Sequence, residues 1–213
     1  MLYNIKHFLY YCVAMTGQEL LLRNIARFIA LDDAEISFLL SSLKVKKLRK
    51  RQYFLQEGDV SKWQAFVCQG CMRVFEVDEK GVEHVIQFAP EDWWVGDLYS
   101  FYTGQPTRLN VEAMEDTELY IFDKDALDVL YEKIPKFERY FRLLMQNALI
   151  ALQERVLSSM SRTASERYDD FIRRYPQIEQ RVPNHQIASY LGIKPESLSR
   201  IRSQSLQKRK SNS

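Results

Sequence analysis

Hydrophobic positions follow two different periods along this chain, and the change between them divides it into parts. Between residues 58 and 122, short apolar runs such as residues 72–75 and 85–88 alternate with glycines. Short strands bounded by turn residues predict an antiparallel sandwich or barrel. Residues 78–81 predict a hairpin turn, because Gly81 accepts the positive φ angle that closes it. Residues 109–114 alternate apolar and polar side chains, which predicts a strand with one buried face.

A helical period flanks this region on both sides. Residues 17–43 predict helix, with acidic residues at 32–35 suited to the positive end of a helix dipole. From Pro135 to Met160 there is no glycine and no further proline, which predicts a single helix of about 39 Å. A further helix is expected from Ala164 to Tyr175, because Pro176 ends it.

Two apolar stripes run along the predicted helix at 135–160. The first has the seam spacing of two helices packed at a shallow angle, and it consists of Phe137, Phe141, Leu144, Ala148 and Ala151. The second consists of Met145, Leu149, Leu152, Val156 and Met160. We expect one stripe to cover the chain's own β domain and the other to meet a second copy, with the first stripe at the dimer contact. The alternative is that both stripes are buried within one subunit.

Charge and cysteine usage narrow the class of protein. The formal net charge is only +2, but residues 44–51 and 181–213 are strongly basic. Three cysteines give an odd count without a disulfide framework, which favours a reducing cytoplasm. Residues 1–16 are apolar but lack a cleavage site and are too short to cross a bilayer, so we expect an N-terminal extension and no membrane partner.

Residues 184–201 have the spacing of a helix-turn-helix. Ala188 supplies the small residue where two steeply crossing helices meet, and Gly192 supplies the left-handed turn. Pro195 suits the first turn of the second helix. The wedge between the helices is filled by Ile187, Leu191, Ile193, Leu198 and Ile201.

The outer face of the second helix is polar, with Ser203 at its far end, and predicts contacts to double-stranded DNA in the major groove. Arg200 is suited to bidentate contact with guanine, and Glu196 is suited to accept from cytosine. The expected DNA-binding residues are His185, Lys194, Glu196, Ser197, Ser199, Arg200 and Arg202. The alternative is an ordinary corner between two helices, which uses glycine and alanine in the same way.

From about Leu20 to Arg202 the chain resembles the cyclic-AMP receptor protein/fumarate-nitrate regulator (Crp/Fnr) family. The resemblance rests on residues 56–59, Gln69-Gly70, Gly81, residues 96–98, the long helix and the helix-turn-helix. It implies an α+β fold: an N-terminal antiparallel β-roll (17–134), a long dimerisation helix (135–160) and a C-terminal helix-turn-helix domain (161–213). It also implies a homodimer that regulates transcription at a roughly palindromic operator with RNA polymerase, rather than an enzyme, and it supports Glu196 and Arg200 as base-contacting residues.

The effector pocket departs from the family pattern. Members that bind cyclic nucleotides have Gly-Glu-Leu and, about ten residues on, an arginine followed by serine or threonine. Here the corresponding residues are Gly96, Asp97, Leu98, Thr107 and Arg108. The arginine is displaced by one position, which turns a strand side chain to the opposite face. We therefore expect an unknown signal that is not a cyclic nucleotide, with a cyclic-nucleotide-responsive activator as the alternative.

The sequence has few residues suited to redox, metal-binding or enzymatic chemistry. Cys68 and Cys71 straddle a turn rather than opening a helix, so we expect buried thiols and not a redox pair. His7, His84 and His185 have no metal-ligand spacing, so no metal or cofactor is expected. A small-barrel enzyme would need clustered histidines, which this sequence lacks. A scaffold protein with a vestigial helix-turn-helix is a further alternative. A β-hairpin wing is expected to be absent, with the basic residues 208–210 supplying phosphate contacts instead.

Overall fold

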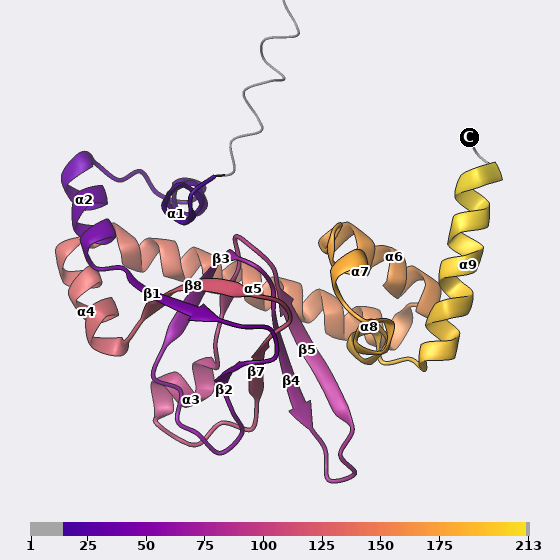
Figure 1. Cartoon of the computed structure of the whole chain (residues 1–213). Coiled ribbons are helices and arrows are strands. Elements are labelled where there is room, and N and C mark those ends of the chain that lie inside the picture. Colours follow the sequence, from indigo (N-terminus) through magenta and orange to yellow (C-terminus); the bar gives the residue numbers. More distant parts are fainter. Residues whose placement is uncertain (1–14, 212–213) are drawn as a thin grey trace, which may run out of the picture.

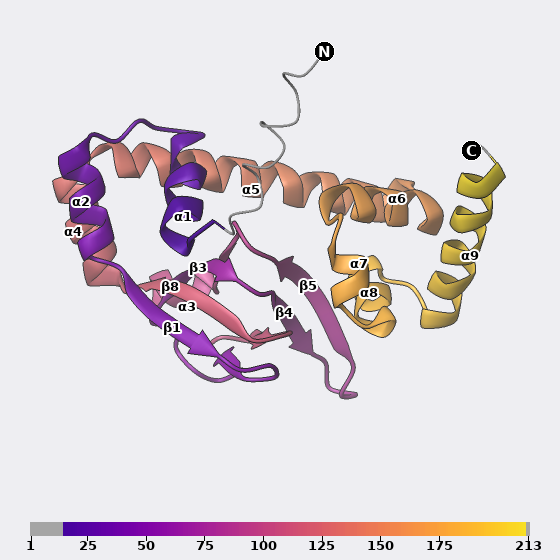
Figure 2. The ribbon, with the colours of Figure 1, turned by 45° about the horizontal axis from the view of Figure 1, so that its top comes forward.

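The computed structural model describes residues 15–211, with side chains described as far as residue 205. The predicted extension at 1–16 lies almost wholly outside the described residues, as do the basic side chains at 208–210. The described chain has a β-rich part and a helical part joined along one long helix (Figure 1 and Figure 2). The fold class is α+β, as the sequence predicts.

Two four-stranded antiparallel sheets form the β-rich part, with strand orders β1-β8-β3-β6 and β2-β7-β4-β5. The strands are β1 (Lys44–Leu48), β2 (Tyr53–Leu55), β3 (Gln64–Gln69), β4 (Met72–Val77), β5 (Glu83–Ala89), β6 (Trp94–Val95), β7 (Asn110–Ala113) and β8 (Thr117–Phe122). Apolar side chains from both sheets form a common buried cluster, including Val67, Val74 and Leu119. This is the β-roll that the sequence predicts.

The hairpin between β4 and β5 closes where the sequence predicts a turn. Gly81 has a φ of +78°, in the left-handed region that favours glycine. The Asp78 carboxylate accepts hydrogen bonds from the backbone N–H groups of Lys80 and Val82, both at 2.9 Å. These bonds fix the hairpin tip.

Strand β7 differs from its prediction, because all four of its residues are buried. It lies between β2 and β4, so its polar side chains are enclosed as well. Asn110 accepts from the backbone N–H of Glu57 at 3.1 Å, and Glu112 forms an ion pair with buried Arg73 at 2.6 Å. The alternating pattern is real, but fixed partners replace water on the polar face.

Helices close one end of the β-roll. The predicted helical stretch 17–43 is two helices, α1 (Gly17–Ala26) and α2 (Asp33–Ser41), and α2 begins at a capping box of Asp32 and Glu35. The other helices of this part are α3 (Leu98–Thr103) and α4 (Lys124–Lys133). Trp94 donates to the Tyr140 hydroxyl, which donates to Asn24, both at 2.7 Å. These bonds join a strand, the long helix and α1.

The helical part follows α5 (Lys136–Ser161), which lies within one residue of the predicted 135–160 helix. It consists of α6 (Ala164–Arg174), α7 (Ile178–Arg181), α8 (Asn184–Leu191) and α9 (Pro195–Ser211). No strand lies between residues 123 and 211, so this stretch contains no wing.

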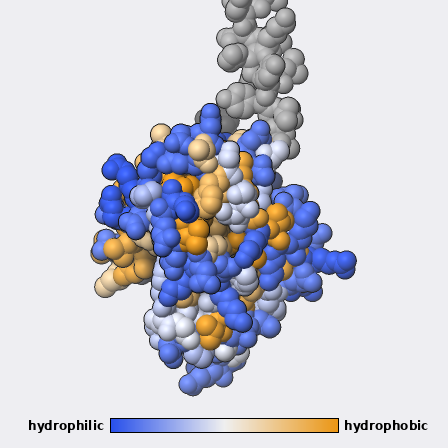
Figure 3. All heavy atoms as spheres, turned by 90° about the vertical axis from the view of Figure 1, so that its left-hand side faces the viewer, coloured by the Kyte–Doolittle hydropathy of each residue, from blue (hydrophilic) through white to orange (hydrophobic). Residues whose placement is uncertain are grey.

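The outer surface carries mainly hydrophilic side chains at the end formed by α2 and α4, where hydrophobic ones gather in small groups (Figure 3). Among residues 15–211, no helix is long and apolar enough to cross a membrane.

Candidate nucleic-acid interface

Helices α8 and α9 form the helix-turn-helix that the sequence predicts. Gly192 ends α8 with a φ of +65°, and Pro195 begins α9 three residues later. Ala188 and Leu198 are completely buried where the two helices meet, with Ile187 beside them. The left-handed turn and the apolar wedge together fix the angle between the helices.

The outer face of α9 is open to solvent. Glu196, Ser199 and Arg200 are exposed, as are Lys194 in the turn and His185 on α8. Ser197 is half-buried. Within the described part of the chain, Arg200 and Lys194 form no ion pair, so their donors are available to an outside partner. A basic and polar helix face of this kind matches the donors and acceptors at base edges and phosphates.

Arg202 faces the protein instead of the solvent. Its Nε lies 2.8 Å from a carboxylate oxygen of Glu179, and it also donates to the Asn184 side chain. Both partners come from neighbouring helices, so Arg202 holds α9 against α7 and α8. The sequence groups it with the DNA-binding residues because helical position alone does not reveal partners from other helices.

The long helix presents an apolar face to solvent, but it is not the predicted seam. Phe137 is completely buried and Phe141 is 9% exposed, both in the core of their own subunit against α4 and Trp94. These two residues therefore do not reach a partner, which corrects the predicted dimer contact. Further along α5, Leu144 and Ala151 are half-buried and Ala148 is exposed.

The exposed face of α5 lies on its C-terminal half and is formed by Leu149, Ile150, Leu152, Val156, Leu157 and Met160. Each of these side chains is at least 50% exposed, and Met160 is 81% exposed. A continuous apolar face of this size on a surface helix is typical of an interface between proteins. Four of these residues, Leu149, Leu152, Val156 and Met160, belong to the second predicted stripe.

The sequence gives no sign that α8 packs against the β-roll. The Ser189 hydroxyl accepts from the backbone N–H of Val85 at 2.9 Å and donates to the carbonyl of Glu83 at 2.6 Å. Since β5 is an edge strand, its free backbone groups are available to this side chain. Phe88 of β5 adds ring contacts to Phe171, Tyr175 and Tyr190 of the helical part, at 6.1, 6.1 and 5.6 Å between centroids.

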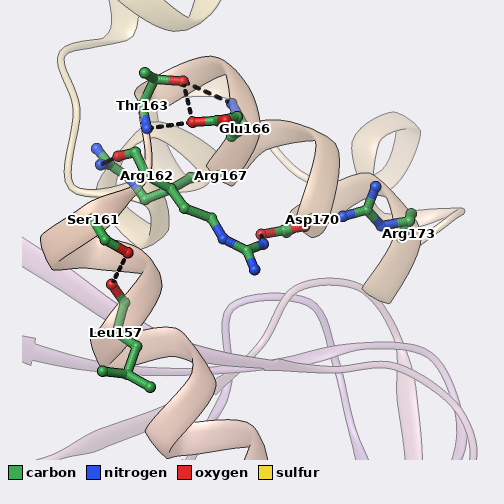
Figure 4. A network of polar contacts seen from close by, with 8 residues as sticks. All are labelled: Leu157, Ser161, Arg162, Thr163, Glu166, Arg167, Asp170 and Arg173. Carbon is green, nitrogen blue, oxygen red and sulfur yellow. Dashed lines mark hydrogen bonds and ion pairs between the residues drawn. The ribbon is translucent and has the colours of Figure 1, made fainter.

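Polar contacts also fix the junction between α5 and α6 (Figure 4). Thr163 and Glu166 form a capping box that starts α6 at Ala164, three residues after α5 ends at Ser161. Arg162 and Arg173 both pair with Asp170. The long helix thus meets the helical part at a short, defined corner.

The β-roll residues at the family's nucleotide-binding positions form contacts with one another or with solvent. The Asp97 carboxylate accepts from the Thr107 hydroxyl at 2.5 Å and from the backbone N–H of Tyr99 at 2.9 Å. The Arg108 side chain is 84% exposed and pairs with Glu76 at 2.5 Å. A site for a cyclic phosphate needs an inward cation, and the arginine here points outward. Gly96 and Leu98 flank this closed arrangement.

Cys68 and Cys71 have no features of a redox pair. Burial raises the pKa of the Cys68 thiol to about 12 and that of Cys71 to about 12. The thiolate is the reactive form, so these groups are inert at neutral pH. Within residues 15–211, no group of histidine, cysteine, aspartate and glutamate side chains is arranged to hold a metal ion.

Comparisons with known proteins agree with this architecture. A family model described as a cyclic nucleotide-binding domain matches residues 45–133. The chain is 24% identical over 170 residues to the "Transcriptional activator protein anr" of Pseudomonas aeruginosa, which covers 73% of this chain and 68% of that protein. It is 27% identical over 185 residues to the "Anaerobic regulatory protein" of Pasteurella multocida, covering 80% of this chain and 66% of that protein.

A solved structure shares the fold. FixK2 from Bradyrhizobium japonicum superimposes with a TM-score of 0.69 at 20% sequence identity, covering 78% of this chain and 85% of that one. The likeness therefore includes both the β-roll and the helices that follow it.

Proposed function

We propose that the chain is a transcription regulator of the Crp/Fnr family, a homodimer that binds DNA in response to a signal other than a cyclic nucleotide. It acts without enzymatic chemistry. Because this role requires access to the chromosome, we propose a cytoplasmic location.

The observation that carries the proposal is the outer face of α9. Leu198 is buried against α8, while Glu196, Ser199 and Arg200 are exposed one helical turn apart on the opposite side. This face suits insertion into a major groove, with Arg200 donating to guanine. Lys194 and His185 flank it and supply contacts to phosphates.

Dimer formation is supported by the apolar face of α5. Parallel packing of two such helices removes from water the side chains of Leu149, Val156 and Leu157, each at least half exposed in the single subunit. A two-fold axis along α5 presents two copies of α9 to DNA, and the operator is then roughly palindromic. RNA polymerase is the expected protein partner of a regulator bound at a promoter.

The cyclic-nucleotide-responsive activator remains the second candidate, because the family model that matches residues 45–133 is described as a cyclic nucleotide-binding domain. The closed Asp97–Thr107 contact and the outward Arg108 favour a different signal. Titration calorimetry with cyclic AMP and cyclic GMP separates the two candidates. Saturable heat that Arg108→Gln abolishes supports the second candidate, and its absence at millimolar ligand removes it.

The DNA-binding proposal is tested by selecting duplexes from a random-sequence pool and measuring their affinity by fluorescence anisotropy. Arg200→Ala is expected to weaken binding to the selected duplex by about 1–3 kcal/mol and to leave binding to unrelated duplexes nearly unchanged. Arg139→Ala, an exposed position on α5, is the matched control and is expected to bind as the wild type does. Full affinity and sequence preference in Arg200→Ala contradict the assignment.

A further inference from the structure

A cavity lies outside both the α9 face and the nucleotide-binding positions of the β-roll. Its volume is about 770 Å³, and its walls come from β5, the C-terminal end of α5, α6 and α8. A cavity of this size suits a small organic molecule. It is therefore lined by the sensor, the long helix and the helix-turn-helix at once.

The charge of this cavity is strongly positive. Its walls contain two carboxylates, Glu154 and Asp170, against five guanidinium groups, and these belong to Arg155, Arg162, Arg167, Arg173 and Arg174. Arg162 and Arg173 share Asp170. The excess of positive charge favours an anion with more than one negative charge.

Three of the arginines have no carboxylate partner within the described residues. Arg155 donates to the carbonyl of Ile86 and lies over the ring of Tyr190, 4.5 Å from its centroid. Arg167 donates to the carbonyls of Leu191 and Arg162 at 3.3 and 2.9 Å. Both side chains belong to half-buried residues. Half-buried cations of this kind are normally paired, and carbonyls neutralise no charge.

Arg174 is the third arginine without a carboxylate partner among the described residues, and it lies beside aromatic rings. Its guanidinium lies 5.4 Å from the ring centre of Trp93 and 5.7 Å from that of Tyr175. Rings and aliphatic side chains also form the remaining wall, including Phe171, Tyr190 and Leu152. Arginine donors beside an apolar wall suit a ligand with a charged group at one end and a ring at the other.

We propose that this cavity binds a small organic dianion with an aromatic body, of the aryl phosphate type. The charged group pairs with Arg155 and Arg167, and the ring packs against Tyr190 and Phe171. Because the ligand touches β5, α5 and α8 together, its binding stabilises one placement of the helix-turn-helix relative to the β-roll. The proposal does not depend on DNA binding.

Phenyl phosphate is the probe that tests the proposal, since it carries one ring and one phosphate. Titration calorimetry on the full chain is expected to show one saturable site per subunit, with affinity about tenfold higher than for inorganic phosphate, which lacks the ring. Phenol, which lacks the charge, is expected to give no saturable heat. The absence of saturable heat with phenyl phosphate overturns the proposal.

Substitutions of the arginines in the cavity wall test where phenyl phosphate binds. Arg155→Gln and Arg167→Gln are each expected to weaken phenyl phosphate binding about tenfold or more, because each removes one charged partner. Arg174→Gln is a third variant, for use if either of the first two fails to fold. Within the described residues, the Arg174 side chain makes no backbone contact. Arg139→Gln on α5 and Arg108→Gln on the β-roll lie outside the cavity and are expected to bind as the wild type does. Equal affinity in all folded variants places the ligand elsewhere and overturns the proposal.

Discussion

Arg200 and Arg202 lie two positions apart on α9, and their surroundings assign them different tasks. Arg200 is exposed with no ion pair within residues 15–205, whereas the Arg202 side chain is 27% exposed and pairs with Glu179. Two arginines of the β-roll differ in the same way: Arg73 is buried between two glutamates, whereas Arg108 points outward. The role of an arginine therefore depends on which carboxylates the fold brings to it.

This difference predicts opposite effects on stability and DNA binding. Arg202→Ala removes a partly buried ion pair and is expected to cost about 1 kcal/mol of unfolding free energy, which lowers the melting temperature by roughly 2–4 °C. Arg200→Ala is expected to leave the melting temperature unchanged, because it removes no intramolecular contact. Thermal unfolding followed by circular dichroism measures both. An unchanged melting temperature in Arg202→Ala would show that Glu179 does not hold α9.

At the scale of elements, α5 has two apolar segments with different surroundings. Its N-terminal half is buried through Phe137 and Tyr140 in the core with α1 and α4. Its C-terminal half turns Leu149, Val156 and Leu157 to solvent. One helix therefore contributes to the core of its own subunit and also leaves an apolar face exposed, which we propose is the dimer contact.

Substitution on the exposed face of α5 tests the dimer. Val156→Asp combined with Leu157→Asp is expected to convert the protein to monomers at micromolar concentration, because two carboxylates cannot be buried between apolar helices without partners. Val129→Asp is the matched control, since Val129 is 45% exposed on α4, away from this face. Sedimentation equilibrium reports the mass. A dimer that persists in the double variant contradicts the assignment of this interface.

An element whose sequence signal comes from neighbouring residues can be predicted from the sequence. An element whose packing depends on residues far along the chain cannot. The turn at Gly192 and the start of α9 at Pro195 need only neighbouring residues, so their spacing suffices. The burial of Phe137 and Phe141 depends on which stripe of α5 meets α4, and both stripes have helical spacing. Likewise, an alternating strand pattern does not reveal that Arg73 covers Glu112.

At the scale of the whole molecule, the sensor and the helix-turn-helix share a core. Val85 and Phe88 of the β-roll lie in one buried cluster with Phe171 and Ile187 of the helical part. Arg181 adds ion pairs to Glu91, at 2.8 Å, and to Glu115. The β-roll therefore contacts α8 directly, in addition to contacting α5.

The contact at Arg181 predicts a pH dependence. Burial by itself raises the pKa of Glu91, but hydrogen bonds from Arg181 outweigh it and hold the pKa below its ordinary value. A carboxylate with a lowered pKa contributes stability above its unfolded pKa of about 4.3, and this stability is lost as the pH falls through the folded value. The unfolding free energy of Arg181→Gln is therefore expected to fall less steeply below about pH 5 than that of the wild type.

Arg173→Gln is the control for this comparison, since it removes an exposed pair within α6. Urea unfolding at several pH values gives the slopes. Equal slopes in Arg181→Gln and the wild type would show that Glu91 does not link the two parts.

We propose that two copies of α9, carried by paired α5 helices, bind one operator. Inserting about five base pairs, half a helical turn, between the half-sites of a selected duplex tests this arrangement. Affinity measured by fluorescence anisotropy is expected to fall about tenfold or more, because the second α9 then faces the wrong side of the DNA. The same insertion outside the half-sites is expected to have no effect. Unchanged affinity for the centrally extended duplex would show that the two copies of α9 do not bind one operator together.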